Sequence, residues 1–70
     1  MRVVAELIPR RVEQTLDLHP GATGIDLLQS LGLAPDAHLL VRDDTPVPLD
    51  AMLEDGQRLR VIAVVSGGRL

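Results

Sequence analysis

The chain contains no cysteine, no lysine and no aromatic residue. Without cysteine it has no disulfide, no thiolate metal site and no cysteine nucleophile. Without aromatic side chains it lacks the stacking platforms that bind single-stranded nucleic acid, and its core must be aliphatic. The seven basic residues are all arginine and are scattered along a chain of net charge −3. This charge pattern argues against a phosphate-binding surface.

The absence of lysine has two explanations. A biased genome composition accounts for it without any function. The functional explanation is that this chain can be attached to lysines of other proteins but cannot accept attachment itself, because it has no side-chain ammonium group.

The length and hydropathy of the chain predict one small soluble domain. Seventy residues lie near the lower limit for folding without disulfides or metals. The first residues lack a long apolar signal segment, and no apolar run approaches the ~20 residues needed to span a bilayer. We therefore expect a cytoplasmic protein with neither membrane nor nucleic acid as a partner.

The hydrophobic pattern predicts an α+β fold. Alternation predicts strands over residues 3–8, 12–18, 37–42 and 58–65, with a short edge strand over 47–49. Thr23 as N-cap, the spacing of Ile25, Leu28 and Leu31, and Gly32 as the stop predict one helix of two to three turns. A turn is expected over 43–46 and a helical turn over 50–55, around Met52 and Leu53. The expected architecture is a mixed sheet of four to five strands with one main helix packed across it and the first and last strands parallel at its centre.

The last residues are the most informative part of the sequence. An apolar run over 61–65 leads directly into Ser66, Gly67 and Gly68, and Arg69–Leu70 follow. Two glycines are costly to order in a regular element, whereas a tail without side chains can enter a narrow enzyme channel. The alternative is an ordinary frayed chain end. We therefore divide the chain into a folded domain over 1–65 and a flexible tail over 66–70.

Several segments together resemble a known family. They are a helix ending in Leu-Gly-Leu over 23–33, the stretch 45–49, Asp55–Gly56 before the last strand, and the passage of that strand into Gly67–Gly68. In this order and at this length, the chain resembles the ubiquitin-like β-grasp sulfur carriers of thiamine and molybdopterin biosynthesis (ThiS/MoaD-like) and the related small archaeal modifiers. The resemblance covers essentially the whole chain and implies a ubiquitin-like β-grasp fold.

The resemblance also implies chemistry at Gly68. An activating adenylyltransferase would use ATP to adenylate the Gly68 carboxylate, and sulfur donor and acceptor enzymes would form and use a thiocarboxylate. Gly67, Ser66 and Val65 would be recognised as the tail. The chain would be a carrier and not an enzyme, with no cofactor or metal of its own. In other members of the family the glycine is joined to a lysine amine.

The chain departs from the family pattern after Gly68. Arg69–Leu70 follow it, and the resemblance implies that a protease, often a zinc metalloprotease, removes such an extension. The alternative is that both residues are retained and activation never occurs. A third function then remains, a non-covalent β-grasp binding subunit whose Gly-Gly pair is idle.

A partner surface is predicted on the last strand. If Ile62 and Val64 lie on the sheet face away from the helix, they form an apolar patch for the activating enzyme. Arg58 and Arg60 on the same face could steer an acidic partner. The alternative is that Val4 and Ile8 half-cover the aliphatic pair and that the arginines are merely solvated. His19, His38 and Asp43–Asp44 lack the ligand partners of a metal or catalytic site.

Overall fold

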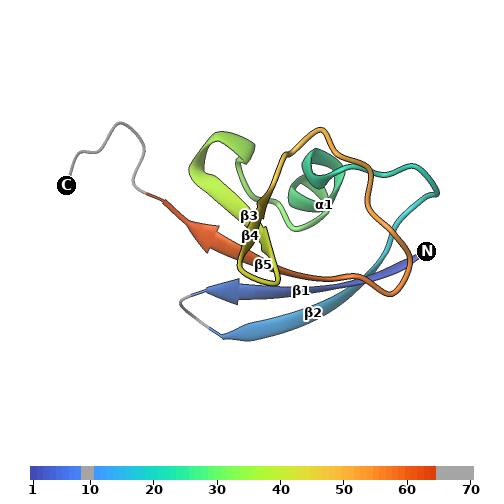
Figure 1. The fold of residues 1–70 in the computed structure, drawn as a ribbon, viewed down its shortest axis with the longest axis horizontal. Coiled ribbons are helices and arrows are strands. Elements are labelled where there is room, and N and C mark those ends of the chain that lie inside the picture. The colour runs from blue at the N-terminus through green and yellow to red at the C-terminus, as the bar shows by residue number, and fades with distance from the viewer. Residues whose placement is uncertain (9–10, 65–70) are drawn as a thin grey trace.

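The computed structural model describes residues 1–8 and 11–64, which form one five-stranded mixed sheet with an α-helix packed across one face (Figure 1). The strand order in the sheet is β2-β1-β5-β3-β4. The α+β class, the main helix and the mixed sheet predicted from the sequence are confirmed. In chain order the elements are β1 (Arg2–Ile8), β2 (Val12–Asp17), α1 (Gly24–Ser30), the 3-10 turn η1 (Pro35–Ala37), β3 (His38–Arg42), β4 (Thr45–Val47) and β5 (Arg58–Ala63).

The two central strands run parallel, as the sequence predicted. β1 pairs with β5 so that Ala5 lies opposite Leu59 and Ile8 opposite Ile62. Antiparallel neighbours flank this pair, with β2 beside β1 and β3 beside β5. Because β1 and β5 run in the same direction, the C-terminal end of β5 lies at the end of the sheet that is farthest from Met1 (Figure 1).

The core is aliphatic and lies between the sheet and α1. Leu27 and Leu28 of the helix are fully buried against the inward side chains of the sheet. Ile25, which the helical spacing placed in the apolar stripe, is instead 36% exposed. The helix is only seven residues long, and Leu31 and Leu33, which follow it, also pack against the core. The buried hydrophobic residues are Val3, Ala5, Leu18, Ala22, Leu27, Leu28, Leu40, Leu53, Leu59 and Val61.

The hairpin between β3 and β4 is tighter than the sequence predicted. Asp43 and Asp44 both have positive φ, at 50° and 66°, and Arg42 pairs directly with Thr45. Two consecutive residues of positive φ form the two-residue turn that matches the twist of a hairpin. Thr45 and Pro46 therefore belong to β4, which covers Thr45–Val47 and lies at one edge of the sheet. The predicted short edge strand is thus present, but it begins two residues before the predicted range of 47–49.

The segment before β5 also differs from the prediction. The helical turn expected over 50–55 is absent; the chain bends there, and Met52 forms an isolated bridge with Thr23. Met52 is 71% exposed, whereas Leu53 is buried and its N–H donates to the Ala22 carbonyl at 2.8 Å. This contact attaches the segment to the start of α1, so tertiary pairing overrides the local helical preference.

Gly24 permits the close approach of α1 to the segment before β5. The Ile25 N–H donates to the Leu49 carbonyl at 3.0 Å. A Cβ at Gly24 would lie 2.5 Å from Leu40 Cδ1 and 3.1 Å from the Leu49 carbonyl oxygen. The Leu40 side chain is itself fully buried, so it has little room to move away.

Gly24→Ala is therefore expected to destabilise the domain, although alanine is the better helix former. Overpacking of this kind costs about 1–3 kcal/mol, against the ~1 kcal/mol that alanine gains in helix propensity. Urea unfolding measures the difference, with Ser30→Ala as the control at an exposed position of the same helix. A Gly24→Ala protein more stable than the wild type would contradict the proposed close packing.

Candidate interaction site at the end of strand β5

The candidate site lies where the chain leaves the sheet. The Val64 N–H donates to the Ala37 carbonyl at 2.9 Å, which continues the pairing of β5 with β3 by one step. The described part of the chain stops at this residue. The predicted site residues Val65, Ser66, Gly67 and Gly68, and the predicted tail over 66–70, lie outside the described residues. The site described below is thus the surface from which the tail departs.

An apolar patch covers this end of the sheet, on the face opposite the helix. Ile62 lies between Ile8 of β1 and Leu39 of β3 in direct register. Leu39 is 41% exposed and Val64 is 43% exposed, while Ile8 and Ile62 are half-buried. Strand alternation places Val64 on the same face as Ile62. We call Ile8, Leu39, Ile62 and Val64 the apolar patch.

One member of the patch, Leu39, was not identified from the sequence as a surface residue, whereas Ile8 was expected next to Ile62. Leu39 lies in a run of three apolar residues with Leu40 and Val41. Such a run has no alternation, so the sequence does not show which residue faces away from the helix. The pairing register settles it, because Leu40 lies opposite the buried Val61 and Leu39 opposite Ile62.

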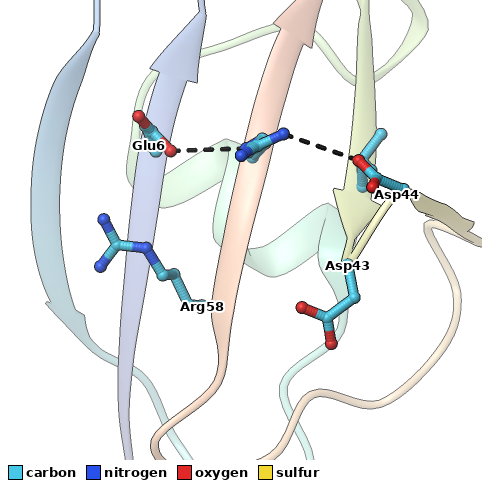
Figure 2. A pocket seen from close by; sticks show the side chains of 6 residues that line it. Glu6, Asp43, Asp44 and Arg58 are labelled. Carbon is cyan, nitrogen blue, oxygen red and sulfur yellow. Dashed lines mark ion pairs between the residues drawn. The ribbon is translucent and has the colours of Figure 1, made fainter.

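An ionic network adjoins the patch on the same face. Arg60 lies 3.6 Å from Glu6 and 3.8 Å from Asp44 (Figure 2). Arg58 reaches across β1 to pair with Glu13 of β2. Both arginines that were predicted to steer an acidic partner are therefore paired within the chain. Exposed pairs of this kind contribute about 0–1 kcal/mol each to stability. Charged groups of a partner can therefore replace them at little cost in free energy.

The hollow beside this network is unsuited to a small ligand. It has a volume of about 220 Å³, is partly open, and is lined by five charged side chains together with Val41 (Figure 2). Ligand pockets are typically about 300–1,000 Å³ and mostly apolar. We therefore assign it to the ionic network rather than to a binding site.

The polar groups around the start of α1 form a helix cap. The Thr23 N–H donates to an Asp26 carboxylate oxygen at 2.9 Å, and the Asp26 N–H donates to the Thr23 hydroxyl oxygen at 3.5 Å. His19 lies 3.6 Å from the same carboxylate. The hydroxyl also contacts this carboxylate at 3.3 Å, so both side chains are engaged with each other and with the first backbone N–H groups of the helix. The group acts as a capping box.

This cap makes stability depend on pH. The backbone hydrogen bond from Thr23 is the main cause that lowers the pKa of Asp26. A carboxyl whose folded-state pKa is lowered stabilises the protein above its unfolded pKa of about 3.9 and loses that contribution as the pH falls through the folded value.

Asp26→Asn is therefore expected to lower the thermal midpoint at pH 7, and the difference from the wild type should shrink as the pH falls below about 4. Asp50→Asn, at another exposed carboxylate, is the control for a change of net charge. Thermal unfolding followed by circular dichroism from pH 7 to pH 2.5 measures both. A difference that stays constant through this range would show that the Asp26 charge has no part in the cap.

His38, the other histidine of the chain, makes a local contact with the backbone. The imidazole Nδ1 of His38 lies 2.8 Å from the Ala34 carbonyl oxygen, beside η1. Across residues 1–8 and 11–64, no three metal-binding side chains gather in one place. In the same residues, no helix has the length and apolar character needed to cross a membrane.

Taken together, the sheet order, the parallel central strands and the single covering helix define a ubiquitin-like β-grasp domain. The model of one protein family, described as small archaeal modifier protein 2, matches residues 1–65. The chain belongs to this family, whose members are modifiers or carriers rather than catalysts. Family membership implies interaction with activating enzymes in general.

A relative with partial coverage is known from Archaeoglobus fulgidus. The chain is 42% identical over 43 residues to a protein of that organism described as uncharacterized. The match covers 61% of this chain and 63% of the relative, so the chain spans less than two thirds of that relative's length.

Proposed function

We propose that this chain is a sulfur carrier that is activated at the carboxylate of Gly68 after Arg69–Leu70 are removed. The observation that carries the proposal is the family match over residues 1–65, because Gly67–Gly68 follow only two residues beyond it. From Val64, four further residues reach at most roughly 14 Å when fully extended. This length is enough for Gly68 to enter a partner's active site while the partner rests on the sheet.

The proposed chemistry takes place at a carboxylate that is a poor electrophile at neutral pH. A carboxylate oxygen of Gly68 attacks the α-phosphorus of ATP, and pyrophosphate leaves. A sulfur donor at the oxidation level of sulfide then attacks the acyl carbon through its sulfur, and the bond to AMP breaks. A thiocarboxylate forms, and AMP and a proton are released, with no change of oxidation state. The catalytic groups and ATP belong to the partner, and this chain supplies the reacting carboxylate.

The proposed docking surface for the activating enzyme is the apolar patch. It lies on the face opposite α1, at the end of the sheet where β5 ends. A partner bound there would be close to the point at which the chain continues toward Gly68. The adjoining ionic network holds three carboxylates, those of Glu6, Glu13 and Asp44, against two arginines. The network is thus slightly acidic, and a partner with basic groups around an apolar centre is complementary to it.

Leu39→Ala is expected to weaken docking to the activating enzyme about tenfold, which corresponds to ~1.4 kcal/mol and is typical of an exposed apolar contact in an interface. The matched control is Ile25→Ala, which removes an exposed aliphatic side chain from the helix side. The concentration dependence of pyrophosphate release gives the apparent affinity. Equal losses for the two variants would argue against the patch as the docking surface.

The family description also favours a second function, a protein modifier whose Gly68 is joined to lysine amines of other proteins. Both functions begin with the same activation. Lysine-linked conjugates of the chain in a cell extract would distinguish the modifier, and a thiocarboxylate on the free chain would distinguish the carrier.

Removal of Arg69–Leu70 can be tested in the native cell. Intact mass spectrometry of the purified protein should find a species ending at Gly68. A protein that ends at Leu70 under every growth condition would instead favour the non-covalent binding subunit, in which the Gly-Gly pair is idle.

A further inference from the structure

The permanently charged basic side chains of this protein share one chemical property, in that none of them is a nucleophile at neutral pH. All seven are arginine, whose guanidinium remains protonated in proteins, whereas a lysine amine loses its proton readily and then attacks acyl carbon. Arg58 and Arg60 make exposed ion pairs, a role that lysine also fills. Strand β5, which leads toward Gly68, thus carries cations without amines.

The one amine in the structure lies far from the tail. The Met1 amino group donates to the Leu18 carbonyl at 2.8 Å and is partly buried. β1 and β5 are parallel, with Ile8 opposite Ile62, so Met1 and Val64 stand nine strand positions apart, about 30 Å at 3.3 Å per residue. The four residues from Val64 to Gly68 reach roughly 14 Å at most. Gly68 therefore cannot reach the amine of its own chain.

We propose that this protein acts only as a donor in lysine-directed acyl transfer. Its activated Gly68 is not captured by a side chain of its own chain or of a second copy, nor by the Met1 amine of its own chain, so each acceptor lysine receives one copy without lysine-linked chain extension. The inference rests on the proposed activation of Gly68. It applies to the carrier and to the modifier, because a thiocarboxylate precursor and a conjugation intermediate are both acyl groups that a nearby lysine would consume.

The excluded reaction is aminolysis. A neutral amine nitrogen attacks the Gly68 acyl carbon, a C–N bond forms, the bond to the leaving thiol or AMP breaks, and the nitrogen releases a proton to solvent. Exposed Arg11 and Arg42 offer positions at which a charge-conserving lysine would restore this reaction. Arg11 lies near the end of the sheet from which the tail departs, and Arg42 lies near the other end.

The test needs no activating enzyme. A chain of residues 1–68 is prepared chemically with a thioester at Gly68; all described contacts lie within residues 1–64, so the shortening removes none of them. Wild type, Arg11→Lys and Arg42→Lys are incubated at mildly alkaline pH. N-acetyl-lysine is added to parallel samples at rising concentration until its conjugate is detected, which shows that the thioester undergoes aminolysis. Mass spectrometry then follows self-linked species.

The wild type is expected to give the hydrolysed acid and the N-acetyl-lysine conjugate, with no cyclic species and with much less of the species of twice the mass than the lysine variants give. Both lysine variants are expected to give self-linked dimers. Dimers of the wild type in amounts similar to those of the variants, joined through Met1 or a hydroxyl, would overturn the inference. So would lysine variants that capture no more acyl group than the wild type. A failure of Gly68 activation by the cellular enzyme would instead count against the proposed function, because this test does not use that enzyme.

Discussion

Replacing Gly67 by valine is expected to abolish activation of the chain by its adenylyltransferase while leaving the fold intact. A branched side chain next to the reacting residue would collide with the walls of a channel shaped for a bare backbone. A displacement of about 1 Å at a reacting group can cost roughly 10²-fold in rate. We therefore expect a fall of at least that size in ATP-dependent pyrophosphate release.

The fold should not respond to this substitution, because the core residues found in the described part of the chain all lie between Val3 and Val61. The thermal midpoint of Gly67→Val should thus equal that of the wild type. Gln29→Ala, at an exposed position of α1 on the other side of the sheet from the apolar patch, is the control and should be activated normally. Full activity of Gly67→Val would refute the idea that the tail must enter a narrow channel.

Leu59→Ala is expected to have the largest effect on stability. Leu59 is fully buried on the central strand β5, opposite Ala5 of β1. Truncation of a buried leucine to alanine costs about 2–5 kcal/mol. A domain of this size has a total stability of roughly 4–10 kcal/mol at 0.05–0.15 kcal/mol per residue. The variant should therefore lose a large part of its free energy of unfolding, and its urea midpoint should fall accordingly.

The control for this experiment comes from the same sheet. Leu39→Ala removes the same atoms from a position that is 41% exposed, so its loss should be much smaller. Urea unfolding of the two variants compares a core position with a patch position. Together with the docking measurement, it separates the two roles, because Leu59 should affect stability and Leu39 should affect affinity. Equal destabilisation by the two would contradict the assignment of faces.

The sequence was sufficient to predict the main elements where local signals agree. Thr23 and Gly32 bound the helix as expected, with a capping box at one end and a glycine of φ +73° at the other. Alternation over residues 3–8 and 12–18 predicted the first two strands. A parallel pair of the first and last strands at the centre was compatible with the single helix, because the helix supplies the cover that such a pair needs.

The predictions that failed depend on tertiary contacts. The conformation of Asp43–Asp44 is set by the pairing of Arg42 with Thr45, and the segment around Met52 is bent by its bridge to Thr23. The apolar patch needed the pairing register to bring Ile8, Ile62 and Leu39 into one row. The partners of Arg58 and Arg60 come from strands that are distant in sequence, and charge alone does not identify them.

The most direct test of the account compares two forms of the chain with ATP and the adenylyltransferase of its own cell. The form that ends at Gly68 should release pyrophosphate and, with a sulfur donor, yield a product in which sulfur replaces one carboxylate oxygen. The form that retains Arg69–Leu70 should release none. Pyrophosphate release from the longer form alone, or from neither form, would contradict activation at Gly68.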